Sequence, residues 1–181
     1  MAIAPHPAAH MVIEDRLVYL RTVVSIALAD GRTEPRELEK LRRLVRVLEL
    51  PSSALDEVLT ALRAARGSGD AVPGASAAQV AGFRGLRAVR SYLVMDAIAI
   101  AFSDAELVPA ESRRIAELAH LVGVEPDEIY MLAGFVEKIL FKRDADSRVL
   151  AAELGVAVGA PGAGEGLVEM VRRVAGEQGE A

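Results

Sequence analysis

The chain has 181 residues, no Cys, 4% aromatic residues and a formal charge of −5. The absence of Cys excludes a disulfide scaffold, a thiolate zinc site and a cysteine nucleophile. The net negative charge argues against general nucleic-acid binding. We predict a cytoplasmic protein without a membrane-spanning segment. The best candidate for a span, 92–102, has only 11 residues and is interrupted by Asp96, whereas a span needs about 20 mostly apolar residues.

Apolar residues recur at intervals of three and four along the chain, which predicts amphipathic helices and no strands. The hydroxyl of Thr33 is expected to cap the second helix, and Pro35 and Pro109 stand in first turns. The fold class is therefore all-α, a bundle of six or seven helices. In chain order they are expected at residues 12–29, 33–48, 54–65, 86–103, 109–123, 126–142 and 144–154.

Composition divides the chain into larger units. The predicted domain covers residues 12–143, with halves at 12–66 and 84–143 joined by a linker, 67–83, that is rich in Gly, Ala and Ser. Residues 144–181 are expected to form a short helix and an acidic, loosely structured tail. This tail holds seven acidic and three basic residues, which is typical of a solubilising end.

An internal repeat connects the two halves. Shifting the chain by 74 residues aligns identical residues of the first half with the second and keeps apolar residues in register. Each half then has the order helix, Asp-containing turn, Pro-started helix, short turn and helix. The halves are predicted to pack as pseudo-symmetric units of one bundle. The identical pairs are Ile26–Ile100, Ala27–Ala101, Asp30–Asp104, Pro35–Pro109, Glu37–Glu111 and Leu44–Leu118.

The repeated turn contains an unusual carboxylate. Asp30 and Asp104 each follow the C-terminal end of a predicted helix, where the helix dipole disfavours negative charge. Three explanations remain open. The side chain can form an Asx turn, face the N-terminus of the next helix, or bind a cation. The cation ligands beside the Asp would be Glu34 and Glu37 in the first turn, or Glu106 and Glu111 in the second. Oxygen ligands of this kind suit calcium or magnesium.

The stretch Ala27-Leu-Ala-Asp-Gly-Arg-Thr-Glu-Pro-Arg-Glu37 resembles the signature of the tellurite-resistance TerB-like family. That signature is Ala-Asp-Gly, a short polar turn and a Glu early in the next helix. Asp104, Pro109 and Glu111 resemble the family's second turn, although Ala105 stands where Gly is expected. The resemblance covers residues 12–62 and 86–142. It extends to the N-terminal helical domain of DnaJ-type membrane co-chaperones.

This resemblance implies both a fold and a function. The fold would be a compact helical bundle with pseudo-repeated halves, and the function would belong to metal or oxyanion stress responses. The resemblance also implies divalent-metal binding at the acidic turns, which here would use Asp30, Glu37, Asp104 and Glu111.

Three further polar residues invite an interpretation. Asp96 interrupts the apolar fourth helix, and a buried lone carboxylate is costly. We expect it on a polar stripe with Tyr92 and Ser103, or paired with an Arg. His6 and His10 lie among Pro and Ala residues and are expected to be disordered.

Two helix faces could bind a partner. Arg36, Lys40 and Arg43 share one face of the second helix, but interleaved Glu residues make a solvated, salt-bridged face the expectation. The sixth predicted helix, 126–142, is apolar nearly all round, which is typical of a central helix. It also offers a face for a homodimer.

The residues do not predict an enzyme. The three His have no partners at informative spacing, and the Gly-rich segments lack the Lys of a phosphate-binding loop. We predict a non-catalytic binding or adaptor domain linked to stress responses, with weak divalent-cation binding at the acidic turns and an unidentified protein partner. The alternative is a purely structural protein–protein interaction module with no metal site.

Overall fold

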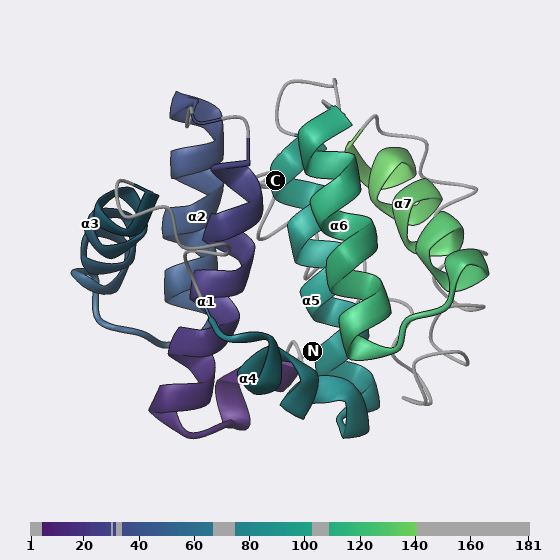
Figure 1. Ribbon diagram of the computed structural model, residues 1–181, viewed down its shortest axis with the longest axis horizontal. Helices are drawn as coiled ribbons and strands as arrows, with labels where there is room; N and C mark the ends of the chain where they lie inside the picture. The colour runs from purple at the N-terminus through teal and green to yellow at the C-terminus, as the bar shows by residue number, and fades with distance from the viewer. Residues whose placement is uncertain (1–4, 30, 32–33, 67–74, 103–108, 141–181) are drawn as a thin grey trace, which may run out of the picture.

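The computed structural model describes residues 5–29, 31, 34–66, 75–102 and 109–140. These ranges contain only helices and their connections, which confirms the predicted fold class. Figure 1 shows α3 at one edge of the bundle and α7 at the opposite edge, with α1, α2, α5 and α6 between them. The helices are η1 (Pro7–His10), α1 (Ile13–Ala27), α2 (Pro35–Val47), α3 (Ala54–Arg66), α4 (Ala77–Ala81), η2 (Gly82–Gly85), α5 (Arg87–Ala101), α6 (Pro109–Val122) and α7 (Pro126–Leu140).

The long helices follow the same order in the two halves. Helices α5, α6 and α7 begin 74, 74 and 72 residues after α1, α2 and α3, close to the shift that aligns the sequence. Pro occupies the first position of α2, α6 and α7, where its missing N–H costs no helical hydrogen bond. Pseudo-symmetric packing of the halves stays a prediction. The short helix and acidic tail predicted at 144–181 lie outside the described residues.

The segment expected as a linker, 67–83, is helical in its second part. Ser76 begins α4 with a capping box: its Oγ accepts the N–H of Gln79 at 3.2 Å, and Oε1 of Gln79 accepts the N–H of Ser76 at 3.0 Å. Two donors at the helix start are thereby satisfied. Val80 and Phe83 then bury their side chains in the core. Helix α4 and η2 therefore belong to the bundle.

The helix at the centre of the core is α5, and not α7 as the sequence predicted. Every residue from Ser91 to Ala101 is buried, and α5 contacts α1, α2, α6 and α7. The expectation of a central sixth helix is wrong, because α7 buries only one stripe at helical spacing. Tyr130 on its other side is 78% exposed. The buried stripe consists of Leu132, Phe135, Val136 and Ile139.

No helix in the described part of the chain combines the length and apolar character needed to cross a bilayer.

Candidate functional site

The first acidic turn leads into a helix start that uses two carboxylates. Glu34 is the N-cap of α2, and Glu34 and Glu37 form a capping box in which the N–H of Glu34 donates to Oε2 of Glu37 at 2.7 Å. The predicted cap, Thr33, lies outside the described residues, and the capping residue is Glu34 instead. The carboxylate of Glu37 is thus held at the positive end of the helix dipole, where negative charge is favoured.

The second acidic turn leads into a similar helix start. Glu111 is the third residue of α6, as Glu37 is of α2. Both residues are only 5% exposed, although Glu is almost never fully buried without a partner. The sequence repeat therefore places two buried carboxylates at matching positions of two helices.

The proposed metal ligands are only partly placed. Asp30 and Asp104 lie outside the described residues, so their positions relative to Glu37 and Glu111 stay predictions. Among the residues that are described, no three His, Asp or Glu side chains gather closely enough to hold a metal ion. A complete cation site would therefore need the two Asp residues.

The basic face of α2, formed by Arg36, Lys40 and Arg43, is only partly exposed to solvent. Lys40 is buried, and its Nζ donates to the carbonyl oxygen of Ala99 in the last turn of α5 at 2.7 Å. A cation at the C-terminal end of a helix is favoured by the dipole. Arg43 behaves as expected and pairs with Glu39 at 3.3 Å. Lys40 thus ties α2 to the C-terminal turn of α5.

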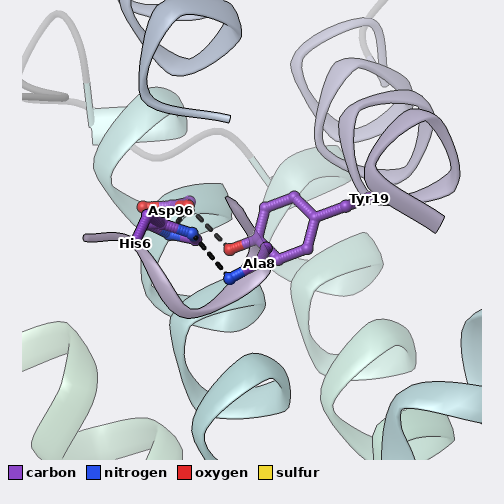
Figure 2. A network of polar contacts seen from close by, with 4 residues as sticks. All are labelled: His6, Ala8, Tyr19 and Asp96. Carbon is purple, nitrogen blue, oxygen red and sulfur yellow. Dashed lines mark hydrogen bonds and ion pairs between the residues drawn. The ribbon is translucent and has the colours of Figure 1, made fainter. Parts of the chain in front are cut away.

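A buried polar network connects the N-terminal segment to α1 and α5 (Figure 2). Oδ2 of Asp96 accepts the hydroxyl hydrogen of Tyr19 at 2.7 Å and lies 3.2 Å from Nε2 of His6. Asp96 is 1% exposed and His6 is 2% exposed. The ring of His6 also meets Tyr19 and Tyr92 edge-on, with centroid distances of 5.5 and 5.0 Å.

The hydrogen bonds identify the protonated nitrogen of His6. The N–H of Ala8 donates to Nδ1 of His6 at 3.1 Å, so Nδ1 must present its lone pair. A neutral imidazole then carries its hydrogen on Nε2, which donates to Asp96. Both ring nitrogens are therefore satisfied, and the carboxylate of Asp96 receives donors from two segments far apart in the sequence.

Both tyrosines beside Asp96 have a pKa above the ordinary value of a phenol. Burial is the main cause for Tyr19, and the neighbouring charge and hydrogen bond of Asp96 add to it. Burial followed by the charge of Asp96 raises the pKa of Tyr92 in the same direction. Both phenols therefore stay neutral at physiological pH, and the hydroxyl of Tyr19 can act as a donor to Asp96.

Two expectations from the sequence are wrong here. His6 was expected to be disordered, but it accepts the N–H of the nearby Ala8 and donates to Asp96, 90 positions away, which fixes its side chain in the core. Asp96 was expected on a polar stripe or beside an Arg, but it is buried and bonded to Tyr19 and His6. The position of Asp96 inside an apolar helix indicated that its carboxylate needs a hydrogen-bonding partner. The partner's identity depended on contacts spanning 77 and 90 residues.

Comparison with known proteins gives a family assignment. No curated protein and no solved structure matches the chain significantly. The family model of the tellurite resistance protein TerB matches residues 20–133, a range that includes both acidic turns and more than half of the chain. The all-helical architecture agrees with the fold that the turn motif implied. The chain therefore belongs to the TerB family.

Proposed function

We propose that this TerB-family protein is a non-catalytic binding domain that responds to a divalent cation at its two acidic turns. The observation that supports the proposal is the pair of buried carboxylates, Glu37 and Glu111, in matching first turns. Asp30 and Asp104 would complete the two sites from the preceding turns.

The donor chemistry favours a hard cation. All four proposed ligands are carboxylates, and calcium and magnesium prefer oxygen ligands, whereas zinc sites usually include Cys or His. Calcium takes six to eight oxygens, so water and backbone carbonyls would join the two carboxylates of each turn. A site with so few protein ligands would bind weakly.

The position of the first turn suggests how a cation could affect a partner. Residues 28–34 connect α1 to α2, and Lys40 links α2 to the end of α5. A cation bound at the start of α2 would therefore bias the arrangement of α2 and α5. We propose that a cytoplasmic protein partner in a stress response binds preferentially to this arrangement of the two helices.

Homodimerisation through α7 is supported by the exposed Tyr130, and light scattering that gives a monomer at high concentration would reject it.

Calorimetric titration of the metal-stripped protein with calcium, magnesium and manganese tests this function. We expect saturable binding that is weakened in Asp30→Asn, Glu37→Gln and Asp104→Asn variants. Glu39→Gln is the matched control, because Glu39 lies on the same helix but is exposed. No binding heat and no shift in melting temperature would reject the cation site.

That negative result would favour the structural alternative. The capping box already gives Oε2 of Glu37 a hydrogen bond from the N–H of Glu34, which is a sufficient structural reason for a carboxylate at this position. The acidic turns would then only shape the bundle, and the protein would act as a protein–protein interaction module without metal.

A further inference from the structure

The N-terminal strap, which we define as residues 5–11, is fastened to the bundle at few points. It contains η1 and packs against α1 and α5. Its buried side chains are those of His6 and Ala8, Met11 is partly buried against the core, and Pro5 and His10 are exposed. Segments that bury little apolar surface open locally at a lower free energy than the whole fold. Detachment of the strap would therefore break these contacts while the helices keep theirs.

The surroundings of His6 have a specific shape and polarity. We call these surroundings the imidazole pocket and define it by Tyr19, Tyr92 and Asp96. Asp96 lies 3.2 Å from Nε2 of His6, and the two tyrosine rings meet the imidazole at interplanar angles of 87° and 89°. The pocket thus offers a hydrogen-bond acceptor and two aromatic walls to a small flat ring that carries an N–H.

An empty pocket would be unfavourable. If His6 left, Oδ2 of Asp96 would lose one of its two donors while the hydroxyl of Tyr19 remained. A buried carboxylate that loses a hydrogen bond favours any group able to replace the donor. A second imidazole satisfies this need and also fills the space between the tyrosine rings.

We propose that the imidazole pocket is a histidine-binding site, which His6 occupies within the same chain, and that the strap is its removable plug. When the strap lifts, the pocket takes the histidine side chain of a partner polypeptide. Recognition uses the ring N–H toward Asp96 and the ring faces and edges toward Tyr19 and Tyr92. The strap therefore competes with the partner, and its sequence, Pro-His-Pro-Ala-Ala-His-Met, serves as the internal ligand.

The first experiment adds imidazole to a full-length His6→Gly variant. At a pH where both compounds are neutral, we expect saturable binding of imidazole that raises the melting temperature. Binding of 1-methylimidazole, which in its neutral form has no N–H to donate to Asp96, should be at least about tenfold weaker. His10→Gly is the matched control, because His10 is exposed on the same strap, and it should gain no imidazole binding. Equal affinity for the two compounds, or no binding to a folded variant, would overturn the proposal.

The second experiment replaces imidazole by a synthetic peptide with the sequence of residues 5–11. The peptide should bind His6→Gly more tightly than imidazole does, and a peptide with Ala in place of its first His should not bind. If both peptides bind equally well, the pocket does not recognise histidine and the proposal fails.

A third measurement uses the unaltered protein and does not depend on the folding of a variant. Hydrogen exchange of the Ala8 amide reports opening of the strap, because Ala8 is fully buried and lifting of the strap exposes it to water, whereas its bond to His6 lies within the strap. We expect it to exchange at least about tenfold faster than the amide of Leu93 in the centre of α5, because strap opening is local. Equal exchange rates would show that the strap opens only when the whole protein unfolds, and would exclude a removable plug.

Discussion

The hydroxyl of Tyr19 donates to Oδ2 of Asp96 at 2.7 Å, which joins α1 to α5 across 77 positions of the sequence. The bond is buried, and its acceptor is a carboxylate in the most enclosed helix of the bundle. A hydrogen bond to a charged group contributes about 1.5–3 kcal/mol. This contact therefore adds a buried, charge-assisted hydrogen bond to the apolar packing between α1 and α5.

Replacement of Tyr19 by Phe should destabilise the protein by about 1.5–3 kcal/mol, because it removes one of the donors to Asp96 while the ring still fills its space. Urea unfolding followed by circular dichroism measures the change. Tyr92→Phe is the matched control: Tyr92 is also buried beside the network, but it makes no hydroxyl bond to Asp96. A loss in Tyr92→Phe as large as in Tyr19→Phe would contradict this assignment.

The helices could be predicted from the sequence because their signals are local. Apolar spacing marked the six long helices, and Pro35 and Pro109 marked the starts of α2 and α6. The burial of Glu37 and Glu111 was consistent with the repeat, because aligned positions share a local environment. The two Asp residues of the turns lie outside the described residues, so that part of the candidate site stays a prediction.

The long-range polar contacts could not be predicted, because each joins segments that only the folded chain brings together. His6 meets Asp96 across 90 positions, and Lys40 meets Ala99 across 59. Helix α4 is a different case. Its capping signature, Ser76-x-x-Gln79, stands in the sequence, but the Gly-rich and Ala-rich surroundings indicated a linker. The composition of residues 67–83 thus led to the expectation of a linker in spite of this local capping signature.

Replacement of Lys40 by Met should destabilise the protein by about 1–3 kcal/mol. The aliphatic stem would still pack, but the carbonyl of Ala99 would lose a charged donor in a buried setting. Thermal and urea unfolding measure the loss. Arg43→Met on the same helix is the control. Its pair with Glu39 is partly exposed, so the expected cost is below about 1 kcal/mol. Similar costs for the two variants would show that the Ala99 contact is not energetically distinct.

Replacement of Ser76 by Ala should lower stability by about 1 kcal/mol, the usual cost of losing a helix N-cap. The change removes the Oγ acceptor of the Gln79 N–H and should expose the start of α4 to proteolysis. Urea unfolding and limited digestion measure these effects. Ser112→Ala is the control, because Ser112 is exposed inside α6 and caps no helix. An unchanged stability in Ser76→Ala would show that residues 77–85 contribute little to the bundle.

Stability should fall as the pH rises above about 10, the ordinary pKa of a phenol. Burial and Asp96 raise the pKa of Tyr19 and Tyr92 in the folded protein, so the unfolded chain loses these protons first. Their contribution to stability is complete below pH 10 and is lost as the pH rises toward the folded pKa values, by about 1.4 kcal/mol per pH unit for each tyrosine.

Urea unfolding between pH 8 and about 11.5 measures this slope of stability against pH. Tyr92→Phe should remove one tyrosine's share of it, whereas Tyr130→Phe, at an exposed position, should leave the slope unchanged. If the Tyr92→Phe curve stays parallel to that of the unaltered protein, the phenol of Tyr92 is not responsible for the alkaline loss.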